Sequence, residues 1–401
     1  MIPRRRLPLE AADLADWLRA PFRRAEAVAA DVAAFERAFA DLLGVPCARA
    51  VASGRDALGL ILDGLGLQAG DELIIPAYTL GELLPLLQSR GLRLVPADID
   101  PATYNLTPES VRARIGPATR ALLVVHLLGA PCDLPALAAL ADEAGIALIE
   151  DCAHAAGATV DGRPVGSVGI AALFSLEANK ALCAFGGGVL ATRDAGLLER
   201  IAPRLAHRPR REWPAMKKAM IKWCEELLVR SPAYGPLARL LFSDRAAQDF
   251  ERFYRGAHGR VRPAACAFSG FQARLALRRL RRLAQHNARN NAAWRDTAAR
   301  LPAALTPQRR DAVGEPAFYN LVACYDGDLR RLRAAALARG IDLGIHGEVM
   351  DDTAAMLGDT GCPQAAAVHR QAVLLPLYPG LGERRRAQLL ERLARAVEDA
   401  A

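Results

Sequence analysis

The chain has 401 residues and a formal net charge of +8, with 52% hydrophobic and 24% charged residues. These proportions are ordinary for a folded protein with a substantial core and exclude a disordered chain. Basic residues are spread over several predicted helices and aromatic residues are only 5%, so we expect no nucleic acid partner. The modest excess of positive charge is explained equally well by a small acidic substrate as by a nucleic acid.

The apolar runs and the cysteines indicate where the chain resides. The longest uncharged apolar runs are too short to span a bilayer, and the N-terminal residues show no secretory signal. The eight Cys include no C-x-x-C pair, which fits a reducing compartment and argues against a zinc ribbon. We therefore expect a cytoplasmic protein without a bound metal.

The lysine count is the most unusual feature of the composition. Only four of the 52 basic residues are Lys, so 48 are Arg. Three of the lysines lie in one cluster, at Lys217, Lys218 and Lys222, whereas Lys180 stands alone. A chain that uses Arg almost everywhere for positive charge has a reason to keep one isolated primary amine, although chance is the alternative.

The predicted elements begin with a helical stretch over 11–44, interrupted only by Pro21. From 45 to 200 strands alternate with helices, which is typical of a parallel sheet covered on both faces. The predicted helices are 55–65, one ending near 90, and 133–144. The predicted strands are 48–52, 73–77, 92–99, 121–128, 146–151, 171–176 and 187–192. The pattern predicts an α/β fold with a mostly parallel seven-stranded sheet.

The second half of the chain predicts a smaller unit. A helical, Arg-rich segment covers 264–300, followed by a strand at 317–325, a helix at 328–339 and a final helix at 382–400. We expect a large domain over 1–255 and a small C-terminal α/β domain over 256–401.

Ligands of open parallel sheets bind at the carboxyl ends of the strands. After the strand 48–52 comes Ser53-Gly54-Arg55 at a helix start, where free N–H groups and the helix dipole favour a phosphate. The alternative is an ordinary capped helix start, with Ser53 or Asp56 as the cap.

Two further strand ends carry chemistry. Asp151 ends the strand 146–151, and Ser175 and Lys180 follow the strand 171–176. A lysine amine can act as a nucleophile and form a Schiff base, which an arginine guanidinium cannot. A lysine, an acid and a phosphate cup together suit pyridoxal 5'-phosphate, whose pyridine nitrogen needs an acidic partner.

These motifs resemble those of the DegT/DnrJ/EryC1/StrS family of sugar aminotransferases, which have the fold-type I architecture of pyridoxal-phosphate enzymes. The resemblance extends over about residues 32–392. The segments that carry it include ASGRDAL (52–58), GDELIIPAYT (70–79), IEDCAHAAGA (149–158), GRPVGSVG (162–169), FSLEANKALCAFGGGVLAT (174–192) and LPLYPGL (375–381).

The resemblance implies roles for individual residues. Lys180 would hold the cofactor and move the substrate proton, and Asp151 would pair with the pyridine nitrogen. His154 would lie near the ring hydroxyl of the cofactor. Ser175, with Ser53, Gly54 and Arg55, would hold the phosphate. Family members are typically homodimers with both sites at the interface.

Three positions depart from the family pattern. Leu80 stands where an aromatic residue usually stacks on the cofactor, and Arg55 replaces a threonine. Arg260 replaces the asparagine of an Asn-x-Arg segment that reaches the phosphate of the neighbouring subunit, whereas Arg262 matches its arginine. The cofactor chemistry therefore looks intact and the acceptor side altered.

The segment 204–258 is longer than the family pattern leads us to expect. Within 216–229, apolar residues recur at helical spacing and lysines and glutamates take the other positions, which predicts an amphipathic helix. This helix could dock on a membrane surface, but we favour packing on its own subunit or across a dimer.

We expect an aminotransferase that moves an amino group from an amino acid, such as L-glutamate, to a keto-sugar, such as a nucleotide-linked one, in polysaccharide or secondary-metabolite synthesis. One alternative is a dehydratase, or an aminotransferase for a cyclitol or another non-sugar ketone. A second alternative is a pyridoxal-binding regulatory protein without turnover.

Overall fold

A computed structural model describes residues 1–241 and 266–401. Its centre is a seven-stranded sheet in which two pairings at one edge, β1 with β10 and β10 with β9, are antiparallel and the others are parallel. The predicted sheet is confirmed, with strand ends that differ from the prediction by at most three residues. In spatial order its strands are β1 Cys47–Val51, β10 Gly188–Thr192, β9 Ala171–Ser175, β6 Ala147–Asp151, β5 Thr119–Val125, β2 Glu72–Pro76 and β4 Arg93–Ala97.

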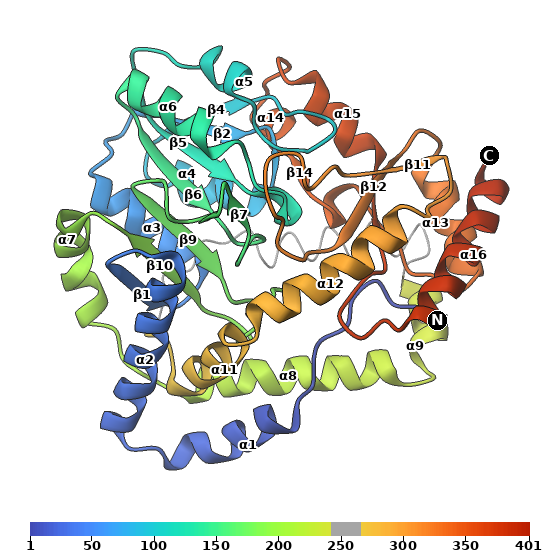
Figure 1. Cartoon of the computed structure of the whole chain (residues 1–401), viewed down its shortest axis with the longest axis horizontal. Helices are drawn as coiled ribbons and strands as arrows, with labels where there is room; N and C mark the ends of the chain where they lie inside the picture. The colour runs from blue at the N-terminus through green and yellow to red at the C-terminus, as the bar shows by residue number, and fades with distance from the viewer. Residues whose placement is uncertain (242–265) are drawn as a thin grey trace.

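Helices cover both faces of this sheet (Figure 1). Alternate residues of a strand point to opposite faces, so Leu122 and Val124 of β5 join the core beneath α2, α6 and α11, whereas Ala121 and Leu123 join the core beneath α3, α4 and α7. The helices of this part are α1 Ala11–Arg19, α2 Ala25–Leu43, α3 Gly54–Leu65, α4 Leu84–Gln88, α5 Pro108–Arg112, α6 Leu134–Ala144, α7 Ala195–Ala206, α8 Trp213–Arg230 and α9 Tyr234–Leu241.

The predicted helix 11–44 is in fact two helices, because the 3₁₀ turn Ala20–Phe22 separates α1 from α2. The break includes Pro21, which has no N–H to continue the hydrogen bonding of α1, and the backbone becomes extended at Arg23. A similar short 3₁₀ turn, Gly81–Leu83, precedes α4.

A second, four-stranded sheet packs with the C-terminal helices. Its strands, in the order β11-β12-β15-β13, are all paired antiparallel. The predicted strand 317–325 begins only at Leu321, because residues 317–320 form a loop that reaches the first sheet. The elements are α11 Gly270–Leu280, α12 Leu283–Ala298, β11 Leu305–Pro307, β12 Leu321–Tyr325, α13 Leu329–Ala338, β13 Gly344–Ile345, α14 Thr353–Met356, α15 Pro363–Gln371, β15 Ala372–Leu375 and α16 Glu383–Ala400.

Short elements complete the described chain. The two-residue strands β3 Tyr78–Thr79 and β14 Asp351–Asp352 pair with each other, as do β7 Thr159–Val160 and β8 Arg163–Pro164. Ile2 packs in the core of the second sheet, and α11 packs against α2. The domain division at residues 255 and 256 stays a prediction.

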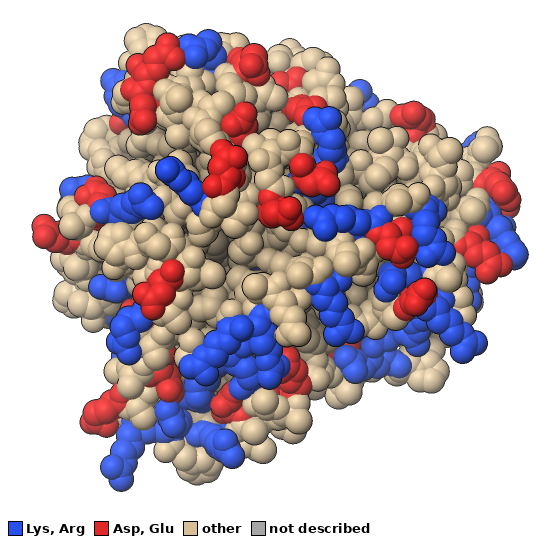
Figure 2. Space-filling model, viewed as in Figure 1, with Lys and Arg blue, Asp and Glu red and all other residues tan. Residues whose placement is uncertain are grey.

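Much of the arginine excess is paired with acids. Arg274, Arg278 and Arg279 of α11 bind Asp13 and Asp16 of α1 and Asp31 of α2. Figure 2 shows the molecule from the same side as Figure 1. Acidic and basic side chains are interspersed over the surface seen there, and the basic ones are densest in its lower half. No helix among residues 1–241 and 266–401 is long and apolar enough to cross a membrane.

The predicted amphipathic helix exists as α8, but the prediction of its buried face is only half right. Met216 and Ala219 are buried as expected, whereas Leu227 is 60% exposed and Glu226 is only 3% exposed. Glu226 accepts hydrogen bonds from the backbone N–H of Leu7 and from the side chain of Arg230. The N-terminal segment thus supplies polar partners that helical spacing alone does not reveal.

Candidate active site

Three chain segments meet at the carboxyl edge of the first sheet. Asp151 is the last residue of β6 and Ser175 the last of β9, and these strands are parallel neighbours. Lys180 follows in the turn after β9, where its N–H binds the carbonyl of Glu177. The N-terminus of α3 lies against the same edge, because a Cβ added to Gly54 would lie 3.3 Å from Cβ of Ser175.

The start of α3 is a capped helix terminus whose free N–H groups face the end of β9. Oγ of Ser53 accepts the N–H of Asp56 at 3.1 Å, so Ser53 is a true helix cap. The first turn of any helix also presents N–H groups that its own carbonyls cannot satisfy. These groups lie beside Ser175, so Ser53, Gly54 and Ser175 are brought together as the phosphate prediction requires.

The other residues predicted to contact the phosphate or the ring are Arg55, Leu80 and Arg260, and their contacts with a cofactor stay predictions. The guanidinium of Arg55 forms an ion pair with Glu82 at 3.2 Å. Leu80 is 40% exposed and directly precedes the 3₁₀ turn Gly81–Leu83. Arg260 and Arg262 lie outside the described residues.

The amine of Lys180 lies in an aromatic setting. Its Nζ donates to the hydroxyl of Tyr319 at 3.2 Å and lies 5.0 Å from the centre of the same ring. The Tyr319 ring stacks on His154, with centroids 4.2 Å apart. Tyr319 falls within the predicted strand 317–325 and is not among the predicted site residues. In the structure it contacts both His154 and Lys180.

Burial, with a smaller effect of the Lys180 charge, shifts the pKa values of two residues near Lys180. Burial raises the pKa of Asp151, and the N–H of Ala153 and the charge of Lys180 offset only part of that effect. One carboxylate oxygen accepts the Ala153 N–H at 2.9 Å; among the described residues the other has no donor. Burial, then Lys180, then Arg5 lower the pKa of His154 well below its usual value, so this imidazole is neutral at pH 7.

Hydrogen bonding also fixes the tautomer of His154. Its Nδ1 accepts the N–H of Leu128 at 3.3 Å. A neutral ring whose Nδ1 accepts carries its proton on Nε2. His154 can therefore offer an N–H donor to a bound group.

An open pocket leads to Lys180. Besides the Lys180 turn, its wall contains Tyr319 and Asn320 before β12, Tyr378 after β15, and Arg5 and Arg6 of the N-terminal segment. Segments far apart in the sequence therefore line the approach to the amine.

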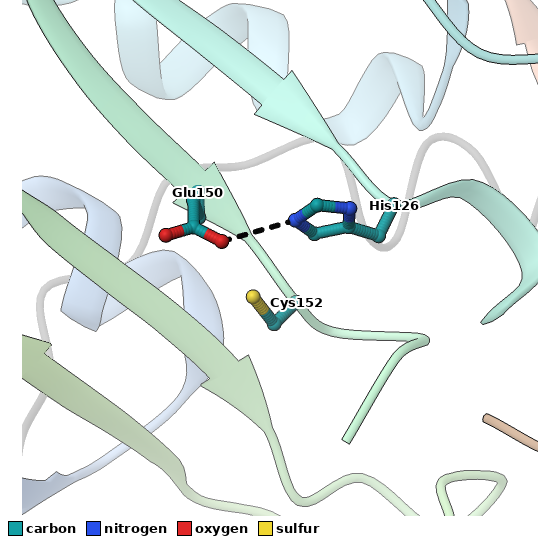
Figure 3. Close-up of side chains that lie close together, drawn as sticks. All are labelled: His126, Glu150 and Cys152. Carbon is teal, nitrogen blue, oxygen red and sulfur yellow. Dashed lines mark hydrogen bonds and ion pairs between the residues drawn. The ribbon is translucent and has the colours of Figure 1, made fainter. Parts of the chain in front are cut away.

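A second cluster lies behind Asp151, formed by His126, Glu150 and Cys152 (Figure 3). Their donor atoms lie within 4.8 Å of one another and are buried. Nδ1 of His126 accepts the N–H of Cys132 at 3.0 Å, and Nε2 binds Glu150 at 3.2 Å. Because both imidazole nitrogens are engaged, this cluster has the hydrogen bonding of a structural network rather than a free set of metal ligands.

Glu150 is the centre of that network. Its oxygens accept the backbone N–H groups of Gly166 at 2.6 Å, Val168 at 2.8 Å and Gly169 at 2.7 Å. Burial alone would raise the pKa of Glu150, but His126 and these N–H groups lower it further than burial raises it. An anchored carboxylate thus joins the strand that ends in Asp151 to the loop 166–169.

One lysine of the 217–222 cluster also reaches the site. Lys218 of α8 pairs with Glu177, three residues before Lys180. Burial raises the pKa of Glu177, but Lys218 more than compensates, so the pKa is lowered. Helix α8 therefore contacts the turn that carries Lys180.

The residues present fit pyridoxal phosphate. Lys180 offers a primary amine, Asp151 a buried carboxylate with one oxygen lacking a donor, and the α3 N-terminus with Ser175 a phosphate cradle. The N–H at Nε2 of His154 adds a donor that would suit the ring hydroxyl of the cofactor.

The fold is that of a fold-type I α/β protein, and the candidate ligand site is centred on Lys180. The sequence model of the DegT/DnrJ/EryC1/StrS aminotransferase family matches residues 26–229, about half of the chain. The chain belongs to this family.

Curated relatives resemble part of the chain. L-glutamine:scyllo-inosose aminotransferase of Streptomyces griseus is 43% identical over 163 residues, which are 40% of this chain and 38% of that protein. UDP-N-acetyl-3-dehydro-alpha-D-glucosamine 3-aminotransferase of Acidithiobacillus ferrooxidans is 41% identical over 165 residues, 41% of this chain and 45% of that protein. The alignments thus span about two fifths of the chain and less than half of these relatives.

Solved structures resemble the whole chain. DesV of S. venezuelae superposes with a TM-score of 0.76 at 26% identity, covering 98% of this chain and 99% of that one. The aminotransferase TlmJ of Streptoalloteichus hindustanus gives a TM-score of 0.77 at 24% identity, with 99% of both chains covered, and shows the fold alone.

Proposed function

We propose that this protein is a pyridoxal-phosphate-dependent aminotransferase acting on a cyclic ketone of the sugar or cyclitol class. One observation carries the proposal: the lone Lys180 lies with Asp151, His154 and Ser175 at the carboxyl edge of the sheet of a family member. Within the described residues these side chains provide an amine, an acid, a neutral imidazole and a hydroxyl, whereas positions 260 and 262 lie outside them.

The residues would divide the work as follows. When bound, pyridoxal phosphate supplies an electrophilic carbon and an electron sink. Lys180 would hold the cofactor through its amine and carry a proton at Nζ, with the Tyr319 hydroxyl orienting that nitrogen. Asp151 would hold a proton on the ring nitrogen, and the neutral His154 would donate from Nε2.

The donor and acceptor belong to the proposal as well. We expect an amino acid donor such as L-glutamate, and a keto-sugar acceptor that is nucleotide-linked. The Acidithiobacillus relative, whose name describes a UDP-sugar aminotransferase, supports this choice. The Streptomyces griseus relative, whose name describes an inosose aminotransferase using L-glutamine, supports a cyclitol acceptor as the second candidate.

The assembly we propose is a homodimer in the cytoplasm, with each site completed at the interface. Its supports are the resemblance of 258–263 to a segment that reaches the neighbouring subunit and the family itself. Sedimentation of the purified protein at several concentrations measures this state, and a monomer throughout would contradict it.

The test separates the half-reactions. Holoenzyme is mixed with L-glutamate or L-glutamine, and the visible absorption of the cofactor is followed without any acceptor. We expect the band to shift with at least one donor, and to be absent in Lys180→Ala but present in Lys217→Ala, which removes an exposed lysine of α8. Transamination is refuted if no amino donor shifts the band.

A further inference from the structure

The N-terminal segment 1–7 is fixed against the rest of the chain on both sides of Arg5. Ile2 forms a β-bridge with Ile341, and Arg4 binds Asp342 at 2.9 Å and Glu348 at 2.7 Å. On the other side, the N–H of Leu7 binds Glu226 at 2.9 Å. Figure 1 shows this end of the chain beside α9 and α16. Arg5 is therefore held in place by its neighbours.

The three consecutive arginines differ in their partners. Arg4 has acidic partners, and Arg6 pairs with Glu226 at 3.4 Å. Arg5 is exposed, and no acid, carbonyl or hydroxyl of the described residues forms a hydrogen bond or ion pair with its guanidinium. It nevertheless lies on the pocket wall shared with Lys180, and its charge contributes to the lowered pKa of His154.

The charge balance of the pocket points to an anionic ligand. Its lining residues include the cations Arg5, Arg6 and Lys180, and neither Asp nor Glu is among them. The hydroxyl of Tyr378, also on this wall, is buried and has no hydrogen bond of ordinary geometry within the described chain. A cationic pocket with an unused donor favours a ligand that carries negative oxygens.

We propose that Arg5 forms an anion subsite at the mouth of the Lys180 pocket and binds a carboxylate or phosphate of the substrate. This inference rests on the proposed function, because it assigns to Arg5 the recognition of a substrate of that reaction. Guanidinium binds either group through paired N–H donors. A carboxylate would belong to the amino donor, and a phosphate to a nucleotide-linked acceptor.

The chain offers a matched control for this subsite. Arg5→Gln removes the charge and leaves a shorter polar side chain, and Arg5→Lys keeps the charge without the paired donors. Arg330→Gln removes one charge from an exposed position on α13, outside the pocket. Thermal melting of all variants verifies that they fold alike.

The first measurement is calorimetric binding of two inert anions to holoenzyme. Succinate carries carboxylates and pyrophosphate carries phosphates, and neither has an amine or a ketone that can react. We expect Arg5→Gln to weaken binding of at least one of them about tenfold, the effect of losing one charge-assisted pair. Arg330→Gln should bind as the unmodified chain does, and Arg5→Lys should recover part of the loss.

The two probes distinguish the source of the anion. If Arg5→Gln weakens the binding of succinate alone, Arg5 is assigned to the carboxylate of the amino donor. If it weakens the binding of pyrophosphate alone, Arg5 is assigned to a phosphate of the acceptor. The inference is overturned if the unmodified protein binds neither anion, or if Arg5→Gln binds both as tightly. This outcome is independent of turnover, so a protein that fails to react with any donor refutes the proposed function without deciding the subsite.

A kinetic measurement then ties the subsite to the reaction. In the donor half-reaction with L-glutamate, a carboxylate role for Arg5 predicts that Arg5→Gln raises the half-saturating concentration about tenfold. The rate at saturation should change much less, because Arg5 would contact the carboxylate of the substrate and not the reacting amine. A fall in the saturated rate alone would contradict a binding role.

Discussion

Replacing Glu150 by Gln tests the buried network behind Asp151 most directly. The two oxygens of Glu150 accept the backbone N–H groups of Gly166, Val168 and Gly169 and face Nε2 of His126. Gln has the same shape but exchanges one acceptor oxygen for an NH₂ donor. In either orientation of the amide, that NH₂ faces two donors that the carboxylate had satisfied.

The size of the effect follows from this geometry. If the NH₂ replaces Oε1, the N–H groups of Val168 and Gly169 lose their acceptor. If it replaces Oε2, the N–H of Gly166 and Nε2 of His126 lose theirs. His126 cannot adapt by changing tautomer, because its Nδ1 already accepts from Cys132. Losing two hydrogen bonds to a charged group, each worth about 1.5–3 kcal/mol, lowers the free energy of unfolding by about 3–6 kcal/mol.

Urea unfolding of Glu150→Gln, followed by circular dichroism, measures this loss. We expect a clearly lower unfolding midpoint, with Glu143→Gln as the control because that carboxylate pairs with Arg112 on the surface. A midpoint unchanged in both variants would refute the assignment of Glu150 as an anchoring carboxylate.

The same network predicts a pH dependence. The pKa of Glu150 is lower in the folded chain than its ordinary value of 4.5. Its contribution to the free energy of unfolding is therefore complete above about pH 4.5 and is lost as the pH falls through the lower folded pKa. Glu150→Gln should show a weaker decline of stability on acidification than the unmodified chain; an identical decline would contradict the lowered pKa.

Two further predictions concern α11 and Tyr319. Asp13→Asn leaves Arg279 buried without its carboxylate, so we expect the free energy of unfolding to fall by about 3–5 kcal/mol, measured by urea unfolding; an unchanged midpoint would count against the ion pairs of α1 with α11. Tyr319→Phe keeps the ring on His154 but removes the hydroxyl from Lys180, so we expect about a tenfold lower kcat/KM in the donor half-reaction with unchanged thermal stability. Unchanged kinetics would show that the hydroxyl does not orient the amine.

The centre of the site could be predicted from the sequence because its residues follow strands. Asp151, Ser175 and Lys180 each end or follow an apolar run, and parallel strands bring such ends to one edge. The scarcity of lysine singled out the amine. Local patterns of this kind determine the sheet, the helix start at Ser53 and the chemistry that these residue types can perform.

The tertiary structure alone decided which distant residues surround that centre. Tyr319 and Arg5 lie 139 and 175 positions from Lys180, and nothing in their local sequence marks a contact with it. Glu226 is buried on a face of α8 that helical periodicity assigns to solvent, because the backbone of Leu7 supplies its donor. Periodicity reports the average polarity of a helix face, whereas burial of a charge depends on a partner that only the folded chain brings into place.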